Sequence, residues 1–195
     1  MTQAPHRLQE LADIEAAIWH ELALAAGDRQ HGWHTPVLAS AGADGVDART
    51  VVLREVDEDA AALAIYTDSR AAKVRQLQAQ PACTLVMWSA DLGWQLRLRC
   101  RVVVHTDGLA VSSRWAHLRA SPGARDYLSP LAPGTAIEDA PGTPLSHAPE
   151  ESAATQREFF AVLIASIEAM DWVELHAQGH RRARFTAMQA QWLVP

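Results

Sequence analysis

The 195-residue chain lacks several features that mark common classes of protein. It has only two cysteines, Cys83 and Cys100, which are too few for a disulfide framework or a zinc site. Each lies in an apolar, strand-like run, so both are interpreted as buried, reduced thiols. An excess of positive charge is also missing. The formal net charge is −6, which argues against nucleic acid as a partner.

Long apolar runs are absent as well. No stretch is apolar enough to span a membrane, and the first ten residues lack the apolar segment of a signal peptide. We therefore expect a cytoplasmic protein with no membrane partner. Apolar residues still make up 49% of the chain, enough for a sizeable core. The length fits a single domain over residues 1–195.

The motifs of several enzyme classes are missing too. No glycine cluster forms a dinucleotide-binding fingerprint or a Walker A loop, and no serine lies in a Gly-x-Ser-x-Gly elbow. His31/His34 and His176/His180 have spacings that could hold a metal, but neither pair has a cysteine or carboxylate cluster nearby. We interpret them as exposed polar histidines and predict no metal site.

Apolar periodicity and turn residues predict the elements of the first half. Apolar residues at steps of three or four predict a helix over residues 6–26 that Gly27 ends. Strands follow in pairs around polar turns. The other predicted elements are two strands within 35–56 separated by the turn 41–45, a strand over 63–67, a short helix within 68–81 capped by Asp68 or Ser69, and a strand over 83–88.

The strand predicted over residues 94–106 has one cationic face. Gln95, Arg97, Arg99 and Arg101 alternate with apolar residues, which is the two-residue period of a strand. These arginines can be a solvated face paired with acidic neighbours such as Glu55. The alternative is a binding surface for an acidic protein or an anionic metabolite.

The second half is less regular. A helix is predicted over 107–120, and residues 128–150 hold five of the ten prolines, which predicts a long loop. Residues 150–170 are predicted to form a helix of about five turns. Residues 171–177 and 181–187 are predicted to form a terminal hairpin, with 188–195 as a tail. The order favours an α+β protein with a mostly antiparallel sheet, whose strands could close into a small barrel.

Four cations surround one strand–turn–helix unit, although the protein is acidic. Arg49 and Arg54 lie in the strand, and Arg70 and Lys73 lie near the start of the helix. Backbone N–H groups at a helix N-terminus, with a hydroxyl and cations, can bind phosphate. Arg49 and Arg54 are five positions apart, so a continuous strand would turn them to opposite faces. Solvated surface charge remains the alternative.

The order of these pieces resembles the pyridoxamine 5'-phosphate oxidase family, and more narrowly its related FMN-binding proteins. The resemblance runs from about Thr35 to the C-terminus. It rests on Arg49-Thr-Val-Val-Leu-Arg54, Tyr66-Thr67, Lys73, Pro81, Leu92-x-x-Gln95 and the Arg-x-Arg-Phe of Arg182 to Phe185. It implies an FMN-binding split β-barrel with peripheral helices and a homodimer with FMN at its interface.

The resemblance also implies roles for particular residues. Arg49, Thr50, Val51, Val52, Leu53 and Arg54 would line the flavin, with Arg49 toward the phosphate or ribityl end. Tyr66 and Thr67 would contact FMN, and Lys73 would pair with its phosphate. Gln95 and Arg184 would lie near the ring. Arg54, Trp115 and Arg119 would lie on the substrate side.

Several residues depart from the family pattern, and the resemblance therefore supports the cofactor better than the substrate. Ala71-Ala72-Lys73 stands where the oxidases have Ser-Arg-Lys, and Arg70 is a hypothetical replacement for the missing arginine. His176 stands where they have a flavin-side tryptophan. The resemblance implies an FMN-dependent oxidoreductase with hydride transfer to flavin, and no residue is assigned as a general base. The alternatives are a non-catalytic flavin-binding or sensing protein and an authentic pyridoxamine/pyridoxine 5'-phosphate oxidase.

Overall fold

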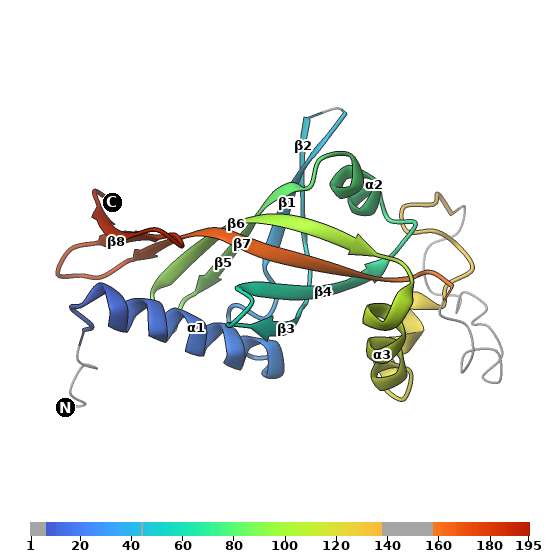
Figure 1. The fold of residues 1–195 in the computed structure, drawn as a ribbon, viewed down its shortest axis with the longest axis horizontal. Helices are drawn as coiled ribbons and strands as arrows, with labels where there is room; N and C mark the ends of the chain where they lie inside the picture. The colour runs from blue at the N-terminus through green and yellow to red at the C-terminus, as the bar shows by residue number, and fades with distance from the viewer. Residues whose placement is uncertain (1–6, 44, 138–157) are drawn as a thin grey trace.

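A single sheet of nine strands dominates the computed structural model, which describes residues 7–43, 45–137 and 158–195 (Figure 1). All pairings are antiparallel, in the order β2-β1-β5-β6-β7-β4-β3, and β8 and β9 extend from β7. The strands are β1 (Val37–Gly42), β2 (Gly45–Thr50), β3 (Leu53–Asp57), β4 (Ala62–Asp68), β5 (Ala82–Ser89), β6 (Trp94–His105), β7 (Phe160–Glu174), β8 (Arg181–Phe185) and β9 (Ala190–Leu193).

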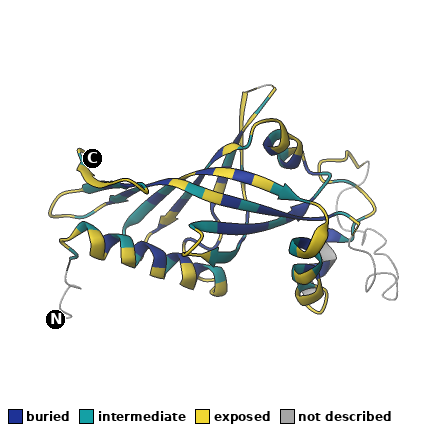
Figure 2. Cartoon of the chain, in the orientation of Figure 1, coloured by how far each residue is buried: buried dark blue, intermediate teal, exposed yellow. Residues whose placement is uncertain are grey.

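Backbone hydrogen bonds join the two ends of this strand order. The N–H of Val51 donates to the carbonyl of Pro36 and the N–H of Leu53 to that of His34, each at 2.9 Å. The residues that lead into β1 therefore bridge β2 and β3. The sheet encloses a core that includes the fully buried Leu85 and Leu98. Alternation of buried and exposed residues along β6 fits the two-residue period of its sequence (Figure 2).

Three α-helices and one short 3₁₀ helix lie around the sheet. They are α1 (Leu11–Gly27), α2 (Ala72–Ala79), α3 (Gly108–Leu118) and η1 (Pro122–Tyr127). Helix α1 buries Ile14, Ile18 and Leu22 and ends at Gly27, as its periodicity predicts. Helix α2 contacts β1 and β6 and lies above the sheet in Figure 1, whereas α3 contacts β6 and β7 and lies below it. No described helix has the length and apolar character needed to cross a membrane.

The helix predicted over residues 150–170 is wrong for its described part. Residues 150–157 lie outside the described residues, and β7 occupies Phe160–Glu174. β7 lies between β4 and β6, and its first four residues are all buried. A strand covered on both faces is apolar without alternation, so its sequence does not differ from that of a buried helix. The terminal hairpin is confirmed by β7 and β8, but the tail contains a further strand, β9.

Smaller predictions also have clear outcomes. Cys83 and Cys100 are buried free thiols opposite each other on β5 and β6, as expected. Neither Asp68 nor Ser69 caps α2, because its N-cap is Ala71 without a side-chain hydrogen bond. Of the predicted 128–150 loop, residues 128–137 contain no helix or strand, and 138–150 lie outside the described residues.

The strand carrying Arg49 and Arg54 is interrupted. β2 ends at Thr50, β3 begins at Leu53, and the register of β3 against β4 shifts between Leu53 and Glu55. The alternation of side chains between the two faces of a strand therefore cannot be followed from Arg49 to Arg54. The two arginines do have different neighbours, but the strand break and the bulge are the reason.

Candidate functional site

The guanidinium of Arg49 is held over β1 by a set of specific contacts. One terminal nitrogen donates to Ser40 Oγ at 2.6 Å and to the carbonyl of Leu38 at 3.3 Å. The other donates to Gln76 Oε1 at 2.8 Å and forms a salt bridge with Asp47. Strand pairing explains this arrangement, because Arg49 lies opposite Leu38 and Asp47 lies opposite Ser40.

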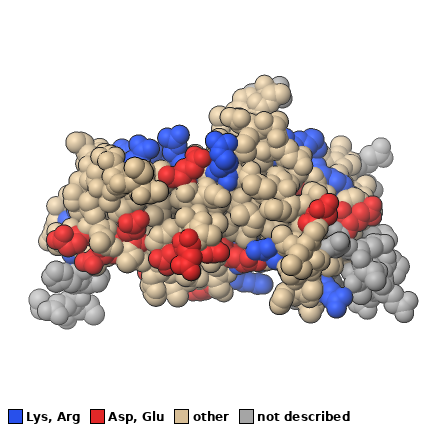
Figure 3. Space-filling model, in the orientation of Figure 1, with Lys and Arg blue, Asp and Glu red and all other residues tan. Residues whose placement is uncertain are grey.

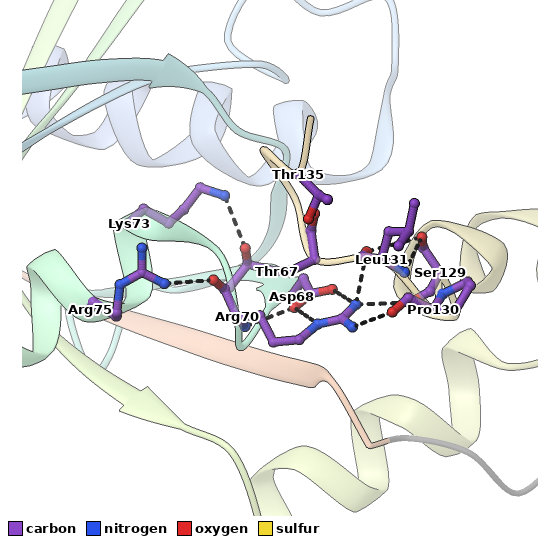
Figure 4. A network of polar contacts seen from close by, with 10 residues as sticks. Thr67, Asp68, Arg70, Lys73, Arg75, Ser129, Pro130, Leu131 and Thr135 are labelled. Atoms are coloured by element: carbon purple, nitrogen blue, oxygen red, sulfur yellow. Dashed lines mark hydrogen bonds and ion pairs between the residues drawn. The ribbon is translucent and has the colours of Figure 1, made fainter. Parts of the chain in front are cut away.

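Lys73, in the first turn of α2, lies near Arg49. Its ammonium donates to Thr67 Oγ1 at 3.1 Å (Figure 4). Burial, followed by repulsion from Arg49, lowers the pKa of Lys73 below its usual range. No described residue forms a salt bridge with Lys73. Two cations close enough to repel each other, beside a hydroxyl and a helix N-terminus, form a suitable site for a dianionic phosphate.

Arg70 serves a different structural purpose. Its guanidinium binds the buried carboxylate of Asp68 at 2.7 Å and lies 3.4 Å from the ring centroid of Phe159. It also donates to the carbonyls of Ser129, Pro130 and Leu131, as Figure 4 shows in part. Arg70 thus ties the segment after η1 to the turn before α2. These contacts occupy the guanidinium and disfavour it as the replacement phosphate ligand.

Arg54 and Tyr66 lie together in a second cluster. The Arg54 guanidinium is 5.8 Å from the centroid of the Tyr66 ring, and its Nε is buried without a partner among the described residues. The Tyr66 hydroxyl donates to Glu55 at 2.5 Å, and Arg114 of α3 binds both oxygens of Glu55. Burial raises the pKa of Glu55, but hydrogen bonds from Arg114 and Tyr66 outweigh it, so the net pKa is lowered. Glu55 and Arg114 also line a hollow of about 610 Å³.

The two residues expected near the flavin ring lie elsewhere on the sheet. Gln95 of β6 pairs with Trp88 and Val173, and Arg184 of β8 lies opposite Asp171. Asp171 forms salt bridges with Arg97 at 2.7 Å and with Arg182 at 2.8 Å. Hydrogen bonds from Arg182 and Arg97 overcome the effect of burial and lower the pKa of Asp171.

The remaining predicted residues are placed as follows. Thr50 ends β2, Val51 and Val52 connect the strands, and Leu53 begins β3, with Val51 and Leu53 buried in the core. Trp115 of α3 is buried against Phe160, with ring centroids 5.3 Å apart. Arg119 follows α3 and is exposed. The backbone N–H of Arg119 donates to the carbonyl of Trp115 at 2.8 Å, and a substrate role for either side chain stays a prediction.

The histidine pairs have ordinary structural contacts. His34 is buried, and its Nδ1 donates to the carbonyl of Ala25 at 2.7 Å, whereas His31 Nε2 lies 2.8 Å from Glu21. The interpretation of this pair as exposed is therefore wrong. His180 is exposed, and the backbone N–H of His176 donates to its ring. The described residues contain no group of three possible metal ligands.

The sequence analysis did not identify Ser40, Gln76 and Asp47, which contact Arg49. It also did not identify the ion pair between Glu55 and Arg114. Asp47 and Gln76 are also hydrogen-bonded to each other at 3.1 Å. Hydrogen bonds from Gln76 and then from Arg49 lower the pKa of the Asp47 carboxyl. No local motif carries these contacts. Only the register of β1 with β2 and the docking of α2 bring them together.

The chain is similar to known proteins in sequence and in fold. Residues 11–106 match the family model described as pyridoxamine 5'-phosphate oxidase, FMN-binding domain. A 66-residue stretch is 41% identical to pyridoxine/pyridoxamine 5'-phosphate oxidase from Thermosynechococcus vestitus. That match covers 33% of this chain and 30% of the relative, so it spans less than a third of that protein.

Two solved structures share the fold along the whole chain. A pyridoxamine 5'-phosphate oxidase-related, FMN-binding protein from Nostoc punctiforme has a TM-score of 0.70, with 23% identity and 100% of each chain covered. PhzG from Burkholderia lata, solved with tetrahydrophenazine-1-carboxylic acid, has a TM-score of 0.74 and 16% identity, with 98% and 99% of the chains covered. The architecture is thus an FMN-binding split barrel. Residues 11–106 thus match the FMN-binding domain of the pyridoxamine 5'-phosphate oxidase family, and the cofactor of that domain is FMN.

Proposed function

We propose that this protein is an FMN-dependent oxidoreductase that binds the FMN phosphate between Arg49 and Lys73. The observation that carries the proposal is the pair of neighbouring cations at the start of α2, where Lys73 is hydrogen-bonded to a hydroxyl instead of a carboxylate. A phosphate dianion relieves the repulsion between the two cations and compensates for the burial of Lys73. The residues present therefore fit the phosphate end of FMN.

The chain's own residues would bind and orient the cofactor. Arg49 and Lys73 neutralise the phosphate, while Thr67 holds the Lys73 ammonium in place. Arg54, on the β3 bulge beside Tyr66, would present its guanidinium toward the flavin or the substrate. Bound FMN would supply hydride acceptance at its ring, followed by reoxidation by oxygen or another acceptor.

We further propose a cytoplasmic, single-domain protein that forms a homodimer with FMN at the interface. Gln95 lies at the start of β6, opposite Trp88 and Val173, and Arg184 lies on β8, opposite Asp171, so a second subunit is one way to bring residues of this kind to the ring end. Apolar side chains exposed on the sheet support an interface. Trp88 is 47% exposed and Val103 is 53% exposed.

The absorbance spectrum of the purified protein tests cofactor binding. A yellow protein that releases FMN on denaturation supports the proposal. A colourless protein that does not take up added FMN contradicts it.

Turnover needs a separate experiment. The FMN-loaded protein is mixed anaerobically with pyridoxamine 5'-phosphate and, in a second sample, with a reduced nicotinamide, while the flavin absorbance is followed. Bleaching identifies an electron donor and supports an enzyme. The 41% identity over 66 residues to a pyridoxine/pyridoxamine 5'-phosphate oxidase favours pyridoxine or pyridoxamine 5'-phosphate as a candidate substrate. The burial of Trp115, a residue expected on the substrate side, argues against these substrates. Failure of both donors to bleach the flavin would favour a flavin-binding or sensing protein.

A further inference from the structure

The contacts of Arg49 point to two residues that no family motif singles out. We infer that Ser40 and Gln76 are positioning residues that fix the guanidinium of Arg49 for the FMN phosphate. The inference rests on the proposed FMN function and deepens it. It concerns how the phosphate ligand is held, because neither Ser40 nor Gln76 carries charge.

Ser40, Gln76 and Arg49 form a closed ring of hydrogen bonds. Arg49 donates from one terminal nitrogen to Ser40 Oγ at 2.6 Å and from the other to Gln76 Oε1 at 2.8 Å. The Ser40 hydroxyl in turn donates to the same Gln76 oxygen at 2.7 Å. Two anchor points on a planar, rigid guanidinium fix its plane and its rotation about the side-chain axis. Loss of either anchor would leave the guanidinium less firmly held, because its other contacts are a longer bond to the Leu38 carbonyl at 3.3 Å and the half-exposed carboxylate of Asp47.

The ring also ties the two halves of the phosphate site together. Ser40 lies on β1 and is 2% exposed, whereas Gln76 lies on α2, one turn after Lys73. Gln76 therefore sets the distance between the strand that carries Arg49 and the helix that carries Lys73. The approach is close at Gly42 as well, where an added Cβ would lie 3.1 Å from Gln76 Nε2. The amide is thus packed between helix and hairpin.

A partner that orients a ligand-binding group contributes to affinity only for the part of the ligand that this group binds. Riboflavin has the same ring and ribityl chain as FMN but lacks the phosphate. The ratio of the two affinities therefore isolates the phosphate site. A general loss of structure would weaken both ligands.

The test is the titration of the full-length apoprotein with FMN and with riboflavin, followed by flavin fluorescence. In Gln76→Met, the affinity for FMN should fall roughly fivefold to tenfold because one anchor is lost, and the affinity for riboflavin should stay unchanged. Ser40→Ala should have a similar effect. The double variant should lose less than the sum, because the two residues share one ring.

The chain offers a matched control in Gln78→Met, because Gln78 is exposed on the same short helix. It should leave both affinities unchanged. Equal weakening of FMN and riboflavin in Gln76→Met would overturn the inference and indicate a purely structural role, and no weakening of either would overturn it as well. Arg49→Met separates this failure from a failure of the proposed function. If Arg49→Met lowers the FMN-to-riboflavin ratio and Gln76→Met does not, only the positioning role fails. If neither lowers it, the phosphate lies elsewhere.

Discussion

Two groups of arginines stand out in this sequence, and the structure treats them differently. Along β6, Arg97 forms a salt bridge with Asp171 and Arg101 forms one with Glu168, both from the neighbouring strand β7. Around the start of α2, Arg49 and Lys73 lie near each other, and only Arg49 has a carboxylate partner among the described residues. In the space-filling view, basic side chains lie mostly above the acidic ones on the visible face (Figure 3).

The difference shows what separates a structural arginine from a ligand-binding one. The prediction that the β6 arginines pair with acidic neighbours is confirmed for Arg97 and Arg101, whose partners are Asp171 and Glu168, whereas Glu55 binds Arg114. Strand register accounts for the first pair, because Asp171 lies opposite Arg97 on β7. Cations whose charge is left uncompensated are the ones that favour an anionic ligand.

Removing Lys73 should have the largest effect on cofactor binding. In Lys73→Met, a charge-assisted contact worth about 1.5–3 kcal/mol is lost, so the FMN affinity should fall about tenfold to a hundredfold. Riboflavin affinity should not change. The measurement is the same fluorescence titration with both ligands. Undiminished FMN affinity in this variant would place the phosphate away from α2.

The pH dependence of FMN binding should also distinguish the Arg49–Lys73 pair from the arginines of β6. Burial and Arg49 disfavour the charged form of Lys73, so its pKa in the ligand-free protein lies below that of an ordinary lysine. The phosphate binds the protonated form. FMN affinity should therefore be constant between the second pKa of the FMN phosphate, about 6, and the lowered pKa of Lys73, and fall as the pH rises through the latter.

Isothermal titration calorimetry in buffers of different ionisation enthalpy checks the same point, because FMN binding should take up protons near the lowered pKa. In Lys73→Met the fall in FMN affinity at high pH should be absent. The same slope in the variant and the unmodified protein would show that another group titrates.

Substitution of Asp47 should raise the affinity for FMN, unlike the substitution of Lys73. Its carboxylate binds Arg49 and so competes with a phosphate for the same guanidinium. Asp47→Asn removes this charge but keeps an oxygen that can accept from Gln76. FMN affinity should rise about twofold to threefold, because an exposed ion pair contributes little, with riboflavin as the control. A fall in FMN affinity would mean that Asp47 helps to hold Arg49 in place.

The smallest effect is expected on β6. Arg101 and Glu168 are both largely exposed, and their ion pair is 3.2 Å long. Arg101→Met should change the free energy of unfolding by less than about 1 kcal/mol in a denaturant titration. It should leave FMN affinity unaltered. A marked loss of FMN from this variant would show that the β6 arginines belong to the cofactor site, which would remove the contrast between the two groups.

Much of the fold could be predicted because its signals are local. The alternation of β6 and the apolar spacing of α1 are read directly from neighbouring residues. β7 was mistaken for a helix because burial on both faces removes the alternation. In the candidate site, Lys73 is hydrogen-bonded to Thr67, and the binding of FMN by Arg49, Thr67 and Lys73 stays a prediction. Ser40 and Gln76 could not be found, because they lie 9 and 27 positions from Arg49.

The most direct measurement is the affinity of the unmodified apoprotein for FMN compared with riboflavin. A phosphate bound by two cations should make FMN the tighter ligand by about two orders of magnitude, from two charge-assisted contacts of about 1.5 kcal/mol or more each. Excess inorganic phosphate should weaken FMN binding and leave riboflavin binding unaltered. Equal affinities for FMN and riboflavin would contradict a phosphate site between Arg49 and Lys73.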